Sequence, residues 1–422
     1  MIQCAPFSSL SLFLALFLAI ITCPEARGQK AVVPPTPTPL IVAADPHVRQ
    51  VVAANTGFGF NLLAQLSQNT PGNVFLSPFG VTSALTMALG GAGGDTRRDM
   101  ASALGLGAMT QEQITQANAL LLPSLTPSDP GVELSVASAL WANRGTAFSP
   151  AFQQATGLYH AHVETLDFTY PGAADTINGW VKENTKGKID HLVSSPDLVG
   201  ATGILTNAVY FHGIWQNKFV KTATHDGPFT LEDGTTKTLP LMSQVEMFSY
   251  LDTSDFQAVS LPYKPGRLSL YVFLPKPGRN LDGFLSGLTA NSWEGWLGKM
   301  QSTKVNITLP RFKVSYQAAL NQPLTALGMR SAFAPGADFT PMGLQSPSGQ
   351  GSFLTGVAHK AILEVDEEGT VAAAATGLVF GFGGGGFAHP PVAMRVDHPF
   401  FCAIRDNVTG AVLFVGVIRD PS

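Results

Sequence analysis

Apolar residues recur with helical spacing early in the chain and with strand spacing later. Positions three or four residues apart predict two core helices. The first carries Phe58, Leu62, Leu63 and Leu66, and the second, which follows Ser77 and Pro78, carries Val81, Leu85 and Leu89.

A third helix is predicted between residues 175 and 187. Either Asp175 or Thr176 would cap its start, and Gly187 would end it. Its apolar side would carry Ile177, Trp180 and Val181.

Strand patterns dominate the second half of the chain. Residues 268–274 form a short apolar run, and residues 359–366 alternate so that Ala361, Leu363 and Val365 face one way. Residues 400–404 and 411–418 read as a hairpin around a turn at 406–410, and its second strand is apolar enough to be buried on both faces. Helices first and strands later predict an α+β protein.

The N-terminal region reads as an export signal followed by a linker. An apolar run at residues 10–21 is too short to span a bilayer, and small residues at 26 and 28 suit a signal peptide covering 1–28. Residues 29–45 contain a proline-rich stretch and are expected to be a linker, which leaves 46–422 as one domain. We expect secretion to the extracellular space or a periplasm, with lipidation of Cys23 as the alternative.

Removal of the signal would leave Cys402 as the single cysteine, so no disulfide could form within one chain. Cys402 lies in an apolar strand pattern and is expected to be a buried structural residue.

Composition argues against several partners. Apolar residues make up 45% of the chain and charged residues only 13%, which indicates a large folded core. The net charge is −4, and no Lys or Arg occurs between residues 104 and 143, so we expect neither a nucleic acid nor an anionic surface as partner. We expect a monomer that needs no cofactor and no metal.

Enzyme signatures are weak. The chain has no G-x-S-x-G elbow. Residues 381–386 match G-x-G-x-x-G, but no helix-forming sequence follows them. His160 and His162 could point to one side of a strand, yet no third ligand accompanies them, and surface histidines explain them better.

The segment from Glu367 to Phe382 is unusual for a loop. From Gly369 to His389 it contains no proline and no charged Asp, Glu, Lys or Arg side chain. Its alternate residues form one face that is first small and then apolar, as expected of a strand that can enter a sheet. This face carries Thr370, Ala372, Ala374, Thr376, Leu378 and Phe380.

This segment resembles the reactive-loop hinge of inhibitory serpins, and other serpin landmarks occur in the family's order. They are NVFLSP at 73–78, WVKENTKGKI at 180–189, TNAVYFHGIW at 206–215, LPRF at 309–312 and DHPFF at 397–401. The resemblance implies helices in the N-terminal half around a large, mostly antiparallel central sheet, smaller sheets, and an exposed reactive loop at about 367–395. It implies an inhibitor of serine-type proteases and not an enzyme.

The resemblance also assigns roles to residues. The hinge would comprise Glu367, Glu368, Gly369, Thr370, Val371, Ala372, Ala373, Ala374, Ala375 and Thr376. A polar "shutter" beneath the sheet would comprise Ser77, Asn207 and His359, and a "breach" where insertion starts would comprise Trp215, Arg311 and Glu367. Two positions depart from the family: Gly80 replaces a second shutter serine, and Lys218 replaces a proline.

The bait bond has two candidates. Counting from the hinge favours Phe382–Gly383, and counting back from Pro399 favours Phe387–Ala388. We prefer the first, because trapping depends on the length between hinge and bait. Both put an aromatic residue at the cut, which predicts a covalent acyl complex with a chymotrypsin- or subtilisin-like protease. The alternative is a non-inhibitory serpin acting as a binding or storage protein, which the glycine run at 383–386 would suit.

Overall fold

The computed structural model describes residues 38–68, 70–125, 131–145, 148–343, 354–370 and 390–422. The α-helices are α1 (Pro39–Ala44), α2 (Pro46–Gln68), α3 (Pro78–Gly90), α4 (Gly94–Ala103), α5 (Gln111–Leu125), α6 (Pro150–Thr156), α7 (Ala173–Asn184), α8 (Ser195–Leu198), α9 (Leu281–Ser286), α10 (Ala290–Leu297) and α11 (Asn321–Leu324). No helix in these ranges has the length and apolar character that a bilayer span requires.

Strands are concentrated after residue 200. They are β1 (Val74–Leu76), β2 (Val132–Asn143), β3 (His162–Leu166), β4 (Gly203–Ile214), β5 (His225–Thr230), β6 (Thr236–Asp252), β7 (Phe256–Pro262), β8 (Leu268–Pro275), β9 (Gln301–Pro310), β10 (Phe312–Ala319), β11 (Gly356–Val365), β12 (Gly369–Thr370), β13 (Val392–Arg395), β14 (Phe400–Asp406) and β15 (Val412–Ile418). The α+β prediction is confirmed.

The two early helices form as predicted. The apolar faces of α2 and α3 are buried. Helix α3 is buried on almost every side, because it packs against α2 and against the strands β2, β4 and β15. Ser77 caps α3 by accepting a hydrogen bond from the Gly80 N–H at 3.0 Å, and Pro78 occupies the first turn, where its missing N–H is harmless.

Two segments differ from the sequence-based expectation. Helix α7 begins at Ala173 with Gly172 as N-cap, so the predicted caps Asp175 and Thr176 lie inside its first turns. Gly187 follows the helix at φ +76° and donates its N–H to the Lys182 carbonyl at 2.7 Å, a left-handed C-terminal motif. The expected linker 29–45 contains α1, whose Val42 is buried where the helix packs on α2 and α5, while Leu40 and Ile41 stay exposed.

The strands form two sheets. One has nine strands in the order β1-β15-β14-β8-β7-β6-β9-β13, with β5 added beside β6. The other has six strands in the order β10-β11-β4-β2-β3, with the short β12 added beside β4. Antiparallel pairs alternate with parallel ones in the six-stranded sheet, since β11–β4 and β2–β3 are parallel.

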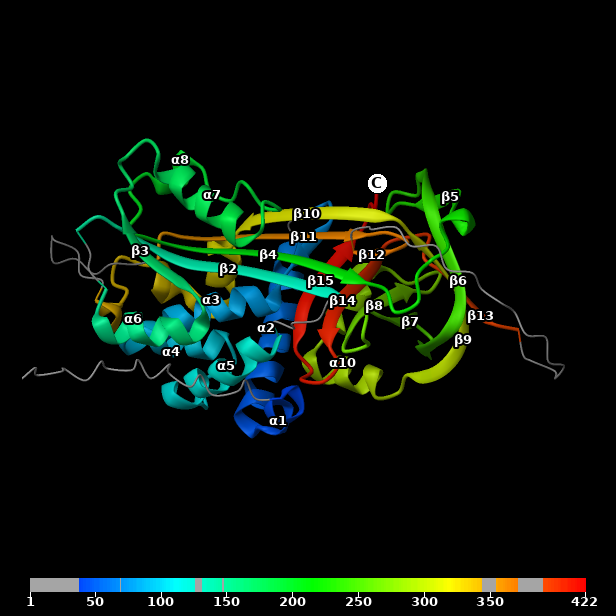
Figure 1. Cartoon of the computed structure of the whole chain (residues 1–422), viewed down its shortest axis with the longest axis horizontal. Coiled ribbons are helices and arrows are strands. Elements are labelled where there is room, and N and C mark those ends of the chain that lie inside the picture. The colour runs from blue at the N-terminus through cyan, green and yellow to red at the C-terminus, as the bar shows by residue number, and fades with distance from the viewer. Residues whose placement is uncertain (1–37, 69, 126–130, 146–147, 344–353, 371–389) are drawn as a thin grey trace, which may run out of the picture. The chain divides into compact units, whose positions relative to one another are not determined.

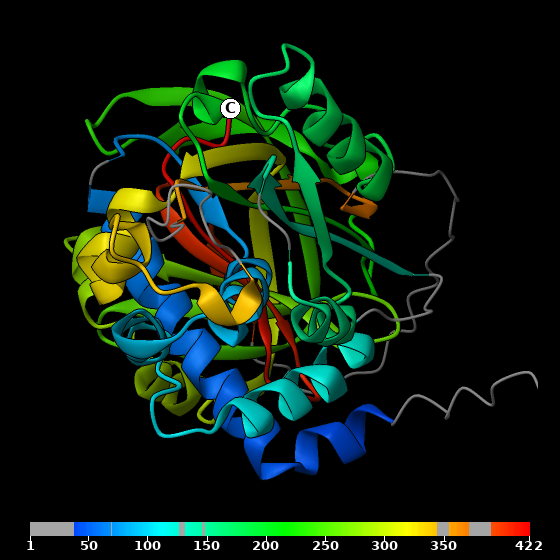
Figure 2. The ribbon, with the colours of Figure 1, turned by 90° about the vertical axis from the view of Figure 1, so that its left-hand side faces the viewer.

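The six-stranded sheet is covered on both faces (Figure 1). Its long strands carry α7 and α8 on one side and helices α2 to α6 on the other, and Figure 2 shows the same arrangement from the end, with the green α7 opposite the blue and cyan helices. Along β4, Leu205, Val209 and Phe211 belong to the large core, whereas Ile204 and Ala208 belong to a smaller core under α7. The core residues of this strand therefore alternate between the two faces of the sheet.

The predicted C-terminal hairpin is confirmed. β14 pairs antiparallel with β15, and β15 is buried at every position. Cys402 is fully buried in β14 as expected, and burial raises the pKa of its thiol to about 12.

Candidate functional site

The centre of the six-stranded sheet has a seam between β4 and β11. The two strands pair in parallel from Gly356 opposite Ile204 to Ile362 opposite Tyr210. Beyond Tyr210, β4 continues to Ile214, but its partner on that side is now β12. The seam is therefore closed along most of its length and parted at one end.

A chain of buried polar groups crosses this seam. The Ser77 backbone N–H donates to Nε2 of His359 at 3.1 Å, so the ring proton sits on Nδ1, which donates to Oδ1 of Asn207 at 2.8 Å. Asn207 in turn donates from Nδ2 to the Ser138 hydroxyl at 2.9 Å. His359 lies on β11, Asn207 on β4 and Ser138 on β2, so the chain links three neighbouring strands. The structure thus brings the three predicted shutter residues together and adds Ser138.

The imidazole of His359 is held neutral. Its side chain is fully buried, and this burial lowers its pKa to about 3. A second proton would also remove the lone pair that accepts from Ser77. Ser77 contributes further by donating its hydroxyl to the Leu413 carbonyl at 2.7 Å, which connects the seam to β15.

Gly80 has a local packing reason. A Cβ at this position would lie 2.7 Å from Oδ1 of Asn207 and 2.6 Å from Cγ2 of Val209. The amide of Asn207 therefore occupies the space that a side chain at position 80 would need. A serine here would require the side chain of Asn207 or Val209 to shift.

The backbone just before the loop is fully docked. Trp215 donates its backbone N–H to the Glu368 carbonyl at 3.0 Å and its indole N–H to the Asp366 carbonyl at 2.8 Å, while the Phe219 N–H donates to the Glu367 carbonyl at 2.9 Å. Asp366 closes a tight turn, because its Oδ1 accepts from the N–H groups of Glu368 at 2.9 Å and Gly369 at 3.1 Å. Burial raises the pKa of Asp366 in this turn.

Gly369 is required by a close backbone approach. Its φ is +145°, and a Cβ would lie 2.1 Å from the Gly213 carbonyl oxygen and 2.7 Å from Cα of Ile214. Any side chain would push the hinge off β4. Trp215, which binds the backbone next to this glycine, is itself held in place, because it is buried and stacks on Tyr263 with ring centroids 4.4 Å apart.

Each hinge glutamate has cationic partners. Glu367 pairs with Arg311 and accepts from the Thr224 hydroxyl at 2.7 Å. Burial alone would raise the pKa of Glu367, but the hydrogen bonds from Arg311 and Thr224 outweigh it and leave the pKa below its ordinary value. The structure therefore brings the three predicted breach residues into one cluster.

Glu368 has a separate pair of partners. Its Oε2 lies 2.5 Å from Nζ of Lys218 and its Oε1 lies 3.2 Å from Nζ of Lys221. The hydrogen bond from Lys218, followed by that from Lys221, lowers the pKa of Glu368. Nothing in the sequence indicated that Lys221 and Thr224 contact the hinge glutamates. Both residues lie in the segment after β4, far before Glu367 and Glu368 in the chain, and only the folded structure brings them together.

Several predicted residues fall outside the described ranges. Thr370 is described by its backbone alone, and the remaining hinge residues and both candidate bonds lie outside, as does the glycine run. These are Val371, Ala372, Ala373, Ala374, Ala375, Thr376, Phe382, Gly383, Phe387 and Ala388.

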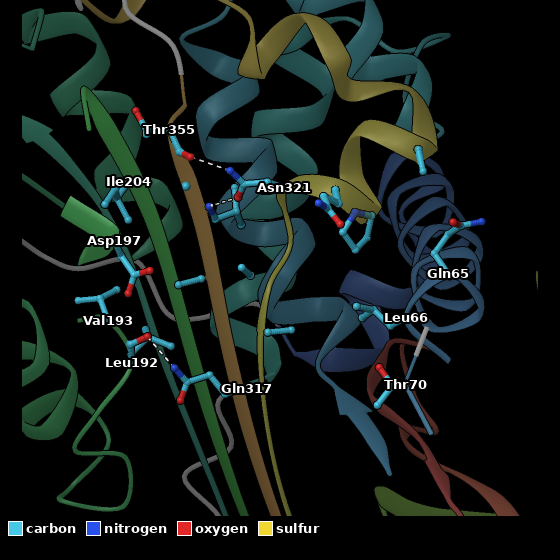
Figure 3. Close-up of a pocket in the computed structure, with 18 residues that line it drawn as sticks. Gln65, Leu66, Thr70, Leu192, Val193, Asp197, Ile204, Gln317, Asn321 and Thr355 are labelled. Carbon is cyan, nitrogen blue, oxygen red and sulfur yellow. Dashed lines mark hydrogen bonds between the residues drawn. The ribbon is translucent and has the colours of Figure 1, made fainter. Parts of the chain in front are cut away.

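A cavity of about 680 Å³ lies at the closed end of the seam (Figure 3). Ile204 of β4, Leu192 and Val193 lie on one side of the strands, and Asn321 and Leu66 on the other. Two of its polar side chains are hydrogen-bonded within the protein. Asn321 donates to the Thr355 carbonyl at 2.6 Å and Gln317 donates to the Leu192 carbonyl at 2.9 Å.

The two histidines of the His-Ala-His motif lie in different surroundings. His160 is exposed at the end of a short turn, whereas His162 lies in β3 and stacks on Trp180 with ring centroids 5.2 Å apart. Within the described ranges, no three His, Cys, Asp or Glu side chains are grouped so as to hold a metal ion.

Comparison with known proteins gives one consistent family. The family model described as "Serpin (serine protease inhibitor)" matches residues 53–421. The leukocyte elastase inhibitor of Bos taurus is 34% identical over 388 residues, covering 89% of this chain and 100% of that protein. Iripin-2 of Ixodes ricinus is 32% identical over 382 residues, covering 88% of this chain and 93% of that protein.

Solved structures agree with this assignment. The native state of the thermophilic serpin tengpin has a TM-score of 0.81 at 26% identity, covering 87% of this chain and 94% of that one. Human thyroxine-binding globulin also has a TM-score of 0.81 at 26% identity, covering 89% of this chain and 100% of that one.

Proposed function

This chain belongs to the serpin family, and we propose on that basis that it inhibits serine-type endopeptidases by inserting its reactive loop into the six-stranded sheet. The observation that carries the proposal is the pairing of β12 with β4. Gly369 lies opposite Ile214 and Thr370 opposite Gly213, antiparallel, at the parted end of the seam. A strand that enters the seam would continue this pairing.

We infer the position of each inserted loop residue by continuing the register of β12. Continued without a bulge, it sets Thr376 opposite Asn207 and Phe380 opposite Gly203, the first residue of β4. Directly opposed residues share a face, so Ala374 and Leu378 would face the large core with Val209 and Leu205. This agrees with the small and then apolar pattern of the sequence.

The same register favours Phe382–Gly383 as the bait bond. A strand that ends opposite Gly203 uses the loop up to Phe380, so Phe382 would lie just beyond the end of β4. The cavity of Figure 3, which Ile204 lines, is at this end of the seam. The alternative bond at Phe387 would leave seven loop residues beyond Phe380, too long a tether to hold a protease against the sheet.

The free energy that drives insertion comes from new strand pairing. Insertion replaces the seven-residue β4–β11 seam with two longer antiparallel seams. The gain is roughly ten ladder hydrogen bonds at about 1 kcal/mol net each, on the order of 10 kcal/mol. A protease still esterified to the cleaved loop would be carried along the sheet, and distortion of its oxyanion hole would stop hydrolysis. The inhibitor supplies no catalytic residue.

The test is incubation with chymotrypsin and, separately, with trypsin. We expect an SDS-stable complex with chymotrypsin and none with trypsin, because the loop offers an aromatic residue and no basic one at either candidate bond. Mass spectrometry should find a released C-terminal peptide that starts at Gly383. A peptide that starts at neither Gly383 nor Ala388 would reject the assignment.

A non-inhibitory binding protein is the second candidate, favoured by the structural likeness to thyroxine-binding globulin. Melting before and after cleavage of the loop separates the two. An inserted loop should raise the melting temperature strongly, whereas a pure binding protein should show no gain.

We also infer export of the protein, on the strength of the N-terminal apolar run alone. The intact mass of protein recovered outside the producing cell should correspond to a chain that begins at Gln29. A lipid adduct on Cys23 would instead support a membrane anchor.

A further inference from the structure

The second hinge glutamate is held by two lysines that the shutter and breach do not include. Glu368 keeps only 9% of its side chain exposed and contacts Lys218 at 2.5 Å and Lys221 at 3.2 Å. Both lysines follow the end of β4, in the segment whose Phe219 N–H donates to the Glu367 carbonyl. We call Lys218, Lys221 and Glu368 the hinge clamp.

The hinge clamp fixes the backbone from which insertion would start. The carbonyl of Glu368 accepts from Trp215 N–H, so side chain and backbone of the same residue are both held by residues 215–221. Immediately afterwards, Gly369 and Thr370 pair with β4 in the antiparallel direction. The first two residues of the entering strand are thus already in register.

None of these contacts lies in the path of the loop. Insertion would separate β4 from β11 between Tyr210 and Ile204, whereas the hinge clamp lies beyond Ile214. Residues 366–370 can therefore keep every contact described above while the strand grows. The clamp would be the same before and after insertion.

We propose that Lys218 and Lys221, by holding Glu368, are positioning residues that keep the hinge in insertion register and so speed loop insertion relative to hydrolysis of the acyl-enzyme. This proposal rests on the proposed function. Because the clamp persists in both states, its contact energy cancels from the free energy that insertion releases. It acts on the rate, by keeping the hinge out of other registers from which the strand could not grow. Its readout is the number of inhibitor molecules consumed per protease inactivated.

The sharpest variant is Lys218→Met with Lys221→Met, which shortens each side chain by one heavy atom and removes both charges. We expect the stoichiometry of inhibition to rise roughly fivefold, the size expected for a partly solvent-screened ion pair. The rate of acylation should stay within about twofold, because the clamp does not touch the bait. The melting gain after cleavage should equal that of the wild type.

Three controls separate a clamp from a general loss of stability. Lys313→Met removes a charge near the same end of the sheet, where Lys313 pairs with Glu364 at 3.4 Å, and should leave the stoichiometry unchanged. The exchange of charges, Lys218→Glu with Glu368→Lys, should restore much of what either single change loses. High salt should raise the stoichiometry of the wild type but not that of the double-methionine variant.

Three results would overturn the proposal: an unchanged stoichiometry in the double-methionine variant, a lowered one, or an equal rise in Lys313→Met. A lowered stoichiometry would mean that the clamp has to open during insertion. Failure of the proposed function looks different, because the wild type itself would then form no SDS-stable complex and gain no stability on cleavage. If double substitution prevents folding, Glu368→Gln gives the same comparison with one uncharged hydrogen-bonding group.

Discussion

Acidification from pH 7.5 to pH 5.0 should destabilise the native protein through His359. The buried ring accepts a hydrogen bond from Ser77 on one nitrogen and donates to Asn207 from the other, which only the neutral form can do. Burial lowers the pKa of His359 to about 3, against an ordinary value of 6.5. The unfolded chain therefore binds a proton at this residue at a pH where the folded chain does not.

The sign and size follow from proton linkage. A histidine whose folded pKa is depressed contributes its full stability above about pH 6.5 and loses it progressively as the pH falls toward the folded pKa of about 3. Each pH unit below 6.5 removes about 1.4 kcal/mol, so the free energy of unfolding should fall by about 2 kcal/mol at pH 5.0. Carboxyl groups with ordinary values of 3.8 and 4.5 titrate mostly below this window, and the raised pKa of Asp366 affects the wild type and the variant described below alike.

The assay is urea unfolding at both pH values and one ionic strength, for the wild type and for His359→Gln. The variant should be less stable at pH 7.5, because the polar chain is broken, but it should lack this part of the pH dependence. The difference between the two pH effects isolates the histidine. Equal pH effects in the two proteins, within about 0.5 kcal/mol, would refute the assignment of a neutral buried ring.

Three further changes test other parts of the structure. Gly369→Ala should raise the stoichiometry of inhibition and lower the melting temperature, because a Cβ would lie 2.1 Å from the Gly213 carbonyl oxygen, and wild-type values for both would contradict the docked hinge. The buried Cys402 thiol, with a pKa of about 12, should resist iodoacetamide at pH 8 in the native protein and react in urea, so rapid labelling of native protein would contradict its burial. Arg267→Met should reduce the free energy of unfolding by about 3–5 kcal/mol in urea titrations, because it leaves the fully buried carboxylate of Asp406 without its cationic partner. In the wild type, Nε and Nη2 of Arg267 bind the two oxygens of Asp406 at 3.0 Å and 2.6 Å. A loss below about 1 kcal/mol would contradict this role.

The elements that periodicity predicted are those that bury one clear face. The apolar stripe of α2, the alternation of β11 and the continuous apolar strand β15 all appear where the sequence indicated them. The predicted start of α7 was wrong. Asp175 is a residue type that commonly caps helices, yet the helix already begins at Ala173, after Gly172. Helix propensity could not show where the helix starts, since its first turn depends on Ala173 and Ala174 packing into the smaller core between α7 and the sheet.

The site was only partly readable in the sequence. Ser77, Asn207 and His359 lie far apart along the chain, and the family resemblance alone suggested that they belong together. Ser138 joins them because β2 pairs with β4 in a register that sets it opposite Asn207, which no local pattern encodes. The glycine at position 80 looked like a departure from the family, and the structure gives its physical reason in the position of the Asn207 amide.

The placement of the C-terminal hairpin bears on how the molecule can be made. β14 and β15 occupy the interior of the nine-stranded sheet, with β8 on one side and β1 on the other. During synthesis, therefore, β8 and β1 emerge with exposed edges and must wait for the final strands before the sheet can close. Completion of this sheet therefore requires translation of residues 400–418, after every other strand of the sheet has been made, so we expect these edges to pair late in folding.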